Sequence, residues 1–336
     1  MSPTLSRRQL FTLDLDSRRP RSSHWIRVHR TAMACRFEVT LSSEDAQHVS
    51  VARRALDEAD RIEAALTVFR DSSELARVNR TAAAAPVTVD EEIFDLLRLC
   101  DELSHATGGA FDVTSTPLSR CWGFLRREGR LPSAGEIDAA RARVGANLVV
   151  LDSAARTVAF ARDGVELNLG SIAKGYALGR MAQVLAAAGV SDALISAGGS
   201  SVLALGGRDE GWTIDVKSRH AGNEPLARLR LRRRTALATS GAGEQFVQVG
   251  GVRYGHVIDP RTGWPARGVL SVSVVADDPA VADALSTAFL VGGAALAEAY
   301  CAQNPEILVL LTPDDGTGRP CMIGSHRGVE IHATHA

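Results

Sequence analysis

The sequence predicts an α+β fold, with mixed or antiparallel sheets, packed helices and two interlocked lobes around one cleft. Apolar residues repeat every two positions in some segments and every three or four in others. These strand and helix segments do not follow the strict alternation of a doubly wound parallel sheet. The 336 residues, 45% of them hydrophobic, suffice for a large core, and no clear linker divides them. We therefore expect one domain over 24–336, preceded by a disordered lead-in over 1–23.

The first third of the chain combines extended segments with helices. Phe37, Val39 and Leu41 alternate as in a half-buried strand. Apolar residues then recur at helical spacing from Ser43 onward. The expected elements are extended segments over 25–41 and helices over 43–66, 74–79 and 90–106.

The remainder alternates between strands and helices. Gly250-Gly251 predicts the turn of a hairpin. The basic cluster of 228–234 alternates with Leu229 and Leu231, which indicates a strand with one solvated face. The expected helices cover 133–144, 172–188, 279–290 and 294–301. The expected strands cover 148–151, 157–160, 193–196, 201–205, 212–216, 244–249, 252–258 and 269–276, with two more closing the chain.

Charge and cysteine content narrow the class of function. There are 38 basic and 39 acidic residues, and this balance argues against a nucleic-acid partner. The five cysteines are scattered without a CxxC pair, which favours free thiols in a reducing compartment. No uninterrupted apolar run reaches the roughly 18 residues of a membrane span, so we expect no stable membrane insertion.

The N-terminal segment contains a sequence similar to a twin-arginine export motif. Arg7 and Arg8 precede Leu10 and Phe11, but aspartates and arginines interrupt the stretch where an export signal needs an apolar region. We therefore predict a cytoplasmic protein. The alternative is a periplasmic protein exported through a degenerate twin-arginine signal.

The segment after Asp278 begins as a helix, with Asp278 as N-cap and Pro279 in the first turn. Within it Asp283, Ser286 and Thr287 are three or four residues apart, so their oxygens share one face of an otherwise apolar helix. Such a set suits Mg²⁺, which prefers oxygen ligands and keeps several waters. A solvated polar stripe is the alternative interpretation.

Two glycine-containing loops are candidates for ligand binding. Residues 168–176 form a small-residue loop entering a helix, where backbone N–H groups and Lys174 favour an anion such as phosphate. In residues 108–114, the glycines allow close approach of a ligand, Phe111 offers a ring for stacking, and Asp112 offers a hydrogen-bond acceptor. A helix C-cap followed by a turn aspartate explains the second loop equally well.

The fourth candidate is the segment 255–263. Its Asp259-Pro260-Arg261-Thr262-Gly263 sequence predicts a tight turn, which places His256 at the end of a strand beside a loop. Of nine histidines, His256 is the best candidate for a general base. A structural histidine is the alternative.

Six ordered blocks over about 33–293 resemble the FAD:protein FMN transferase family, also called the ApbE or thiamine-biosynthesis-lipoprotein family. They are FRDSSELARVNR, TGGAFDVTSTPLSRCWGF, LGSIAKGYALGRMAQVL, ALATSG, HVIDPRTGWPA and ADALSTAF. The resemblance implies a Mg²⁺-dependent enzyme of ApbE-like fold. It would move FMN from FAD onto a Ser or Thr hydroxyl of an acceptor flavoprotein and release AMP.

The resemblance also implies roles for individual residues. His256 would be the base and Asp283 a second catalytic residue. The FAD contacts would be Met33, Phe69, Ala110, Phe111, Asp112, Asn168, Lys174, Val257 and Ile258. The metal ligands would be the Ser171 carbonyl, Asp283, Ser286 and Thr287.

Some positions depart from the family pattern. Asn168 stands where many relatives carry aspartate, and Ser286 stands where some carry a second carboxylate. Segments 198–201 and 240–243 also differ. Two other functions therefore stay open: a Mg²⁺-dependent FAD pyrophosphatase that yields FMN and AMP, and a flavin-binding protein without catalysis.

Overall fold

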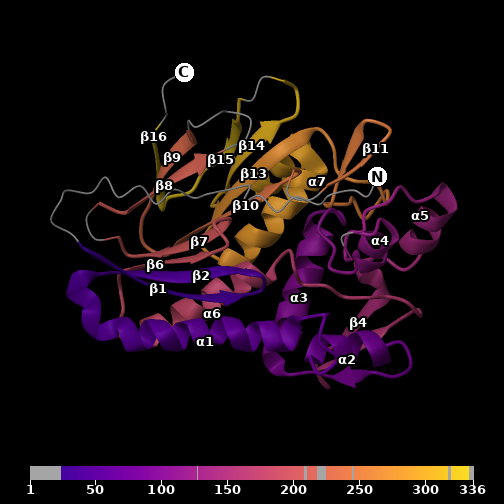
Figure 1. Cartoon of the computed structure of the whole chain (residues 1–336), viewed down its shortest axis with the longest axis horizontal. Coiled ribbons are helices and arrows are strands. Elements are labelled where there is room, and N and C mark those ends of the chain that lie inside the picture. The colour runs from indigo at the N-terminus through magenta and orange to yellow at the C-terminus, as the bar shows by residue number, and fades with distance from the viewer. Residues whose placement is uncertain are drawn as a thin grey trace.

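The computed structural model describes residues 24–126, 128–207, 210–217, 225–243, 246–316 and 319–332 (Figure 1). The expected lead-in over 1–23, with its twin-arginine motif, lies outside these residues, as does Glu244 at the start of the expected hairpin. The described chain is an α+β fold in which all paired strands are antiparallel, so the predicted class is confirmed.

An eight-stranded antiparallel sheet forms the centre of the molecule (Figure 1). Its strand order is β1-β2-β6-β7-β10-β13-β14-β15. The strands span Trp25–Ala32 (β1), Cys35–Ser42 (β2), Ala193–Ala197 (β6), Ser201–Leu205 (β7), Thr235–Gly241 (β10), Val269–Ala276 (β13), Leu308–Pro313 (β14) and Cys321–Gly324 (β15).

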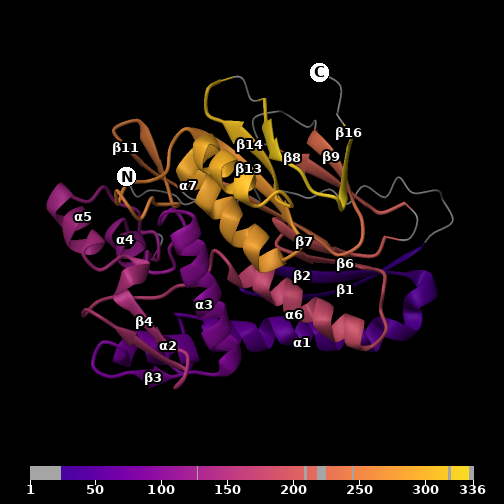
Figure 2. The same ribbon diagram turned by 180° about the vertical axis from the view of Figure 1, so that it is seen from behind.

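Both faces of this sheet are covered (Figures 1 and 2). Helices α1 (Val49–Leu66), α6 (Ala173–Ala187) and α7 (Pro279–Gln303) cover one face. The small sheet of β16 (Val329–His332), β9 (Pro225–Leu231) and β8 (Trp212–Lys217) covers the other.

The two faces explain the alternation along the central strands. Ala236 and Ala238 of β10 belong to the core under the helices, whereas Leu237 belongs to the core under the small sheet. Successive side chains of a strand point to opposite faces, so Ser240 continues the row that faces the helices. Ser201 of β7 also faces the helices, because it lies two residues before Leu203, which belongs to the core under the helices.

The remaining elements lie beside the helix-covered face (Figure 2). They are α2 (Glu74–Thr81), α3 (Glu91–Ala106), α4 (Thr116–Cys121), α5 (Ala134–Arg141), the sheet β3-β5-β4 (Val87–Thr88, Thr157–Phe160, Val149–Asp152) and the hairpin β11-β12 (Phe246–Val249, Val252–Gly255). A small separate core around Trp122 joins α4, α5 and this hairpin. The main core continues into α3, and the division into two lobes around one cleft stays a prediction.

Several local expectations need correction. The first long helix does not open at Ser43: a 3-10 helix, η1 (Ser43–His48), comes first, and non-helical dihedral angles at Asp45 delay α1 until Val49. The basic strand ends at Leu231, and Arg233 adopts a left-handed turn conformation with φ 58°. Strands β3, β10 and β16 and helix α4 were not expected.

Helix α7 combines both helices expected near the C-terminus. Gly293, with φ 69° and ψ −167°, divides it into two segments, between the expected helices of 279–290 and 294–301. It is the one described helix that is long and apolar enough to span a membrane, and 56% of its most apolar stretch is buried in the protein. Packing of α7 against β10, β13 and α6 accounts for this composition, because a helix that is apolar all round belongs in a core.

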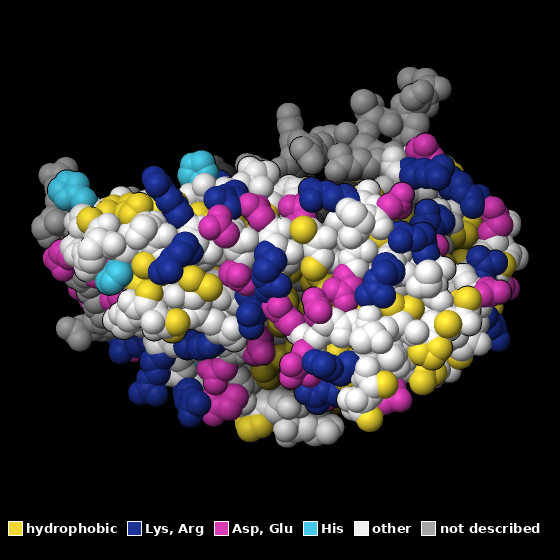
Figure 3. Space-filling model, turned by 90° about the horizontal axis from the view of Figure 1, so that it is seen from below, with side chains coloured by type: hydrophobic (Ala, Val, Ile, Leu, Met, Phe, Trp, Pro, Cys, Tyr) yellow, Lys and Arg dark blue, Asp and Glu magenta, His cyan; other side chains and the backbone are white. Residues whose placement is uncertain are grey.

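Charges of both signs are interleaved on the face seen in Figure 3. Several helices contribute paired groups: Arg61 bonds both Glu58 and Glu92, and Arg180 lies 3.0 Å from Glu92. Tyr176 also donates to Glu92, at 2.7 Å. These contacts connect α1, α3 and α6.

Candidate active site

The carboxylate of Asp283 on α7 lies against the start of α6. Its Oδ1 is 2.9 Å from Lys174 Nζ, and its Oδ2 accepts the backbone N–H of Gly175 at 3.0 Å. Ser201 on β7 donates to Oδ1 at 3.2 Å. The residue is only 2% exposed, so a buried negative charge is held by three donors. The predicted metal face and the predicted phosphate loop are therefore in direct contact.

A glycine at position 175 makes this contact possible. A Cβ atom there would lie 1.9 Å from the carbonyl oxygen of Pro279, which is closer than any non-bonded pair allows. The first turns of α6 and α7 thus touch backbone to backbone. This packing sets the position of Lys174 relative to Asp283.

Three hydroxyl groups lie next to one another one turn further along α7. Ser240 Oγ is 2.7 Å from Ser286 Oγ and 3.2 Å from Thr287 Oγ1. Ser286 also donates to the carbonyl oxygen of Asp283 at 2.8 Å. Ser286 and Thr287 come from the helix face expected from the sequence. Ser240 comes from β10, whose alternation directs it toward that helix.

These groups fit a magnesium ion better than a softer metal. The described residues contain no cluster of three or more His, Cys, Asp or Glu side chains, as a zinc or iron site would need. A single buried carboxylate with neighbouring hydroxyls offers hard oxygen ligands only. Mg²⁺ commonly binds through one or two carboxylates and takes its other ligands from water and phosphate.

The side chain of Asn168 stabilises the loop before α6 by bonding the backbone of that same loop. Asn168 Oδ1 accepts the N–H of Gly170 at 2.9 Å, which closes a turn that an aspartate would also form. The Asn168 N–H donates to the carbonyl of Val113 at 2.8 Å, so this loop adjoins the glycine-containing loop of 108–114. Ser171, expected to offer its carbonyl to a metal, lies three residues before Lys174 and is partly exposed.

The loop of 108–114 differs from expectation in one respect. Ala110 and Phe111 are 2% and 1% exposed and pack in the core, so the Phe111 ring is not an accessible stacking surface and only backbone atoms there can reach a ligand. Asp112 is also buried, and its Oδ1 accepts the N–H and the hydroxyl of Thr114 at 2.8 and 2.6 Å. Burial raises the pKa of Asp112, against the lowering effect of the bonds from Thr114.

The turn between β1 and β2 reaches the same region. Met33 and Ala34 occupy it with φ of 48° and 56°, a conformation that residues other than glycine rarely adopt. The Met33 N–H donates to Glu63 Oε2 at 3.0 Å. Cys35 follows, and burial raises the pKa of its thiol to about 11, with smaller effects from the charges of Lys174 and Asp283. Phe69, by contrast, is 76% exposed.

His256 follows directly after β12, which ends at Gly255 and not at 258 as expected. Its ring makes an edge contact with Phe124, with centroids 6.5 Å apart. The Val257 carbonyl accepts the N–H of Ala266 at 2.9 Å, and Ile258 bridges to Pro265. The adjoining turn contacts the loop of 108–114, since a Cβ at Gly109 would lie 3.7 Å from Arg261 Cγ.

Segments far apart in the sequence are therefore neighbours in the fold. A chain of contacts joins 256–263 to 108–114, then 168–175, and then α7, while the turn at 33–35 lies near Lys174. The sequence prediction missed Ser201, Ser240 and the N–H of Gly175. Ser240 and Gly175 lie in two of the family blocks, ALATSG and LGSIAKGYALGRMAQVL, whereas Ser201 lies in none, and spacing alone does not show which atoms meet.

The family model that describes the ApbE family matches residues 33–311. The chain belongs to this family. An FAD:protein FMN transferase of Treponema pallidum is 34% identical over 247 residues, which cover 69% of this chain and 68% of that protein. One of Klebsiella pneumoniae is 33% identical, with coverage of 71% and 74%. The crystal structure of the ApbE protein of Thermotoga maritima is similar with a TM-score of 0.80 and 31% identity, covering 90% of this chain and 97% of that one.

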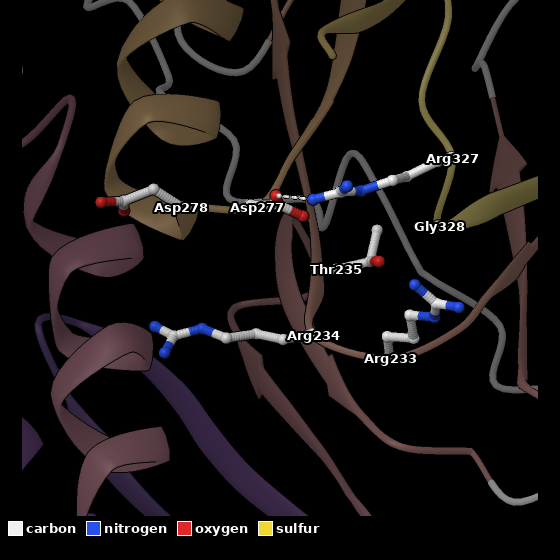
Figure 4. A pocket seen from close by; sticks show the side chains of 7 residues that line it. All are labelled: Arg233, Arg234, Thr235, Asp277, Asp278, Arg327 and Gly328. Carbon is white, nitrogen blue, oxygen red and sulfur yellow. Dashed lines mark ion pairs between the residues drawn. The ribbon is translucent and has the colours of Figure 1, made fainter.

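A hollow in this ApbE family protein lies away from the predicted residues. It measures about 410 Å³ and includes Thr235, at the opposite end of β10 from Ser240. Figure 4 shows Arg327 directed toward Asp277, 3.7 Å away, while Arg233 and Arg234 extend in different directions. None of the candidate site residues lines it.

Proposed function

We propose that this chain is an FAD:protein FMN transferase. It moves FMN from FAD onto a Ser or Thr hydroxyl of an acceptor flavoprotein and releases AMP. Family membership supports the activity. The structural observation that carries the proposal is the contact of Asp283 with both Lys174 and the Gly175 N–H, at 2.9 and 3.0 Å. The face proposed to bind the metal and the helix start proposed to bind the diphosphate meet at this contact.

The reaction breaks the phosphoanhydride bond of FAD and forms a phosphoester bond to the acceptor. The acceptor hydroxyl oxygen forms a new bond to the phosphorus of the FMN half. The bond from that phosphorus to the bridging oxygen breaks, and AMP leaves with the electron pair. The hydroxyl proton goes to a base.

Helix α6 supplies positive potential to the diphosphate. The positive end of its dipole and the ammonium of Lys174 are oriented before the reaction, so they would stabilise charge that builds up on phosphoryl oxygens. Asp283 and the hydroxyls of Ser240, Ser286 and Thr287 would hold Mg²⁺. When bound, that ion neutralises charge on the phosphates and on the departing AMP.

His256 is the proposed base. A hydroxyl is a weak nucleophile near neutral pH, and an imidazole can accept its proton in the transition state. Its position after β12, against Phe124, limits the mobility of the ring. Met33, Phe69 and the backbone of 110–112 and 257–258 complete the proposed FAD contacts.

In-gel fluorescence tests the proposal. Candidate acceptor flavoproteins are co-expressed with the wild type, with His256→Ala and with Ser240→Ala. We expect a fluorescent acceptor band with the wild type, no band with His256→Ala, and a band from Ser240→Ala that needs about tenfold more Mg²⁺. A His256→Ala variant as active as the wild type would remove this residue from the mechanism.

A second measurement separates the alternatives. Purified protein is incubated with FAD and Mg²⁺ without an acceptor, and AMP is measured. Rapid stoichiometric AMP release without any labelled acceptor would indicate a pyrophosphatase instead. Flavin binding with no AMP under either condition would indicate a flavin-binding protein without catalysis.

The compartment is also a proposal. All five cysteines are free thiols, and Cys100 and Cys301 are buried in the core. This pattern favours the reducing cytoplasm over the periplasm. Fractionation of cells that express the full chain tests it.

A further inference from the structure

The β11-β12 hairpin exposes a surface that contains none of the proposed FAD contacts. The first proposed contact after the hairpin is Val257. One face of the hairpin packs inward: Val247 is buried, and the Tyr254 ring lies 5.4 Å from that of Trp122. Two large side chains of the hairpin stay exposed: Phe246, the first residue of β11, is 37% exposed, and Val252, the first residue of β12, is 46% exposed. Large side chains that stay exposed beside a packed aromatic cluster are typical of a protein interaction site.

The outer edge of β12 pairs with no other strand of the described residues. In the register Val249↔Val252 and Val247↔Tyr254, a two-residue turn makes these the hydrogen-bonded pairs. The N–H and C=O groups of Arg253 and Gly255 therefore point away from β11. No backbone hydrogen bond joins either residue to a described residue outside the hairpin. An extended peptide can add here as a third strand.

Charge indicates the kind of peptide. Arg253 lies 4.8 Å above the Phe246 ring, and Arg267 lies 5.6 Å from the Tyr254 ring. Neither guanidinium has a carboxylate within ion-pair distance among the described residues. Arginines supported by aromatic rings and lacking an acidic partner favour acidic residues on an incoming segment.

The edge also leads to the proposed base. Gly255, the second residue with outward backbone groups, immediately precedes His256. Strand residues rise about 3.3 Å each, so the residue of an added peptide next to its pairing with Gly255 would lie beside the imidazole. The segment of 264–266, which pairs with Val257 and Ile258, would end the added strand there. Pairing by backbone would also fix which hydroxyl reaches His256.

We propose that the acceptor flavoprotein binds by adding an extended, acidic segment to the β12 edge, with its reactive Ser or Thr placed at His256. This inference rests on the proposed transferase function. Backbone pairing would supply affinity and register, and Arg253 and Arg267 would supply selectivity for acidic neighbours of the hydroxyl.

Proline substitution distinguishes the two edges of the hairpin. Arg253→Pro removes an N–H that points outward from β12, so it blocks strand addition without breaking a bond to β11. Gln248→Pro is the matched control, because Gln248 pairs with Arg253 and its N–H points outward from β11 instead. Arg253→Ala removes the charge and keeps the N–H.

The probe is the acceptor that becomes fluorescent with the wild type, purified without flavin. We expect Arg253→Pro to raise KM for this acceptor at least tenfold and Arg253→Ala to raise it two- to fivefold. Gln248→Pro should stay within twofold of the wild type, and FAD affinity should be unchanged in all three. An Arg253→Pro variant with wild-type KM, or equal losses in both proline variants, would overturn the docking inference.

Amide hydrogen exchange provides a measurement on the unmodified chain. The acceptor with its reactive hydroxyl residue changed to Ala should slow exchange at the Arg253 and Gly255 amides at least tenfold. Unchanged exchange at saturating acceptor would refute strand addition even if a proline variant failed to fold. Failure of the wild type to label any acceptor would instead overturn the transferase proposal.

Discussion

Replacement of Lys174 by Met tests the ion pair at the centre of the site. Lys174 Nζ lies 2.9 Å from Asp283 Oδ1, and the two side chains are 25% and 3% exposed. Loss of one partner of a buried pair costs about 3–5 kcal/mol. The Gly175 N–H and Ser201 hydroxyl still bond the carboxylate. Because Lys174 is partly exposed, we expect Lys174→Met to lose about 2 kcal/mol of unfolding free energy in EDTA.

The same variant should bind a divalent ion more tightly in the absence of FAD. In the wild type an ammonium already neutralises Asp283, so an incoming cation must displace it. Two like charges about 4 Å apart repel by about 4 kcal/mol at an effective dielectric constant of 20. Lys174 can turn partly into solvent, so we expect a gain of about tenfold, or roughly 1.4 kcal/mol. FAD affinity should fall, because the phosphates lose a cation.

Urea unfolding in EDTA and Mn²⁺ binding by electron paramagnetic resonance measure the two effects. Lys174→Arg keeps the charge and serves as control; it should bind Mn²⁺ as weakly as the wild type. If Lys174→Met loses less than about 0.5 kcal/mol and binds Mn²⁺ no better than the wild type, the ion pair does not act as described.

Further predictions concern packing, pH and exposure. Gly175→Ala should lose about 2–3 kcal/mol of stability, because its Cβ would meet the Pro279 oxygen at 1.9 Å. Gly179→Ala, on the same helix and 3.5 Å from a Pro279 side-chain atom, should be neutral or stabilising in the same urea titration. Burial lowers the pKa of His326 below 6.5, against the raising effect of a neighbouring aspartate. As the pH falls, this histidine takes up a proton at a higher pH in the unfolded chain than in the folded one. Wild-type stability should therefore fall as the pH drops below about 6.5. His326→Asn keeps an acceptor for the Gly328 N–H but cannot titrate. Its stability should therefore lose this dependence on pH, as measured by thermal melts from pH 8 to pH 5. Phe69→Ala should change stability by less than about 0.5 kcal/mol but weaken FAD binding about tenfold, as measured by flavin fluorescence. Unaltered FAD affinity would exclude Phe69 from the binding site.

Local pattern predicted much of the secondary structure. Helical spacing marked α1 and α3, the Asp278 cap marked the start of α7, and alternation marked β2. Pattern failed at β10, because Thr235–Gly241 contains alanine, serine and glycine, which have weak strand preference. It also failed for Phe111, because a ring after two glycines can face a ligand or the core with the same local sequence.

Taken alone, the sequence determined the fold class, the family and which residues share a helix face. Asp283, Ser286 and Thr287 lie together because helical spacing is a local property. Only the tertiary structure showed that Ser201, Ser240 and the Gly175 N–H meet them, since these contacts join residues 46 to 108 positions apart. Such contacts depend on how close α6 and α7 approach each other and on which face of the sheet each strand residue occupies. Both depend on the packing of the whole core, which no local pattern specifies.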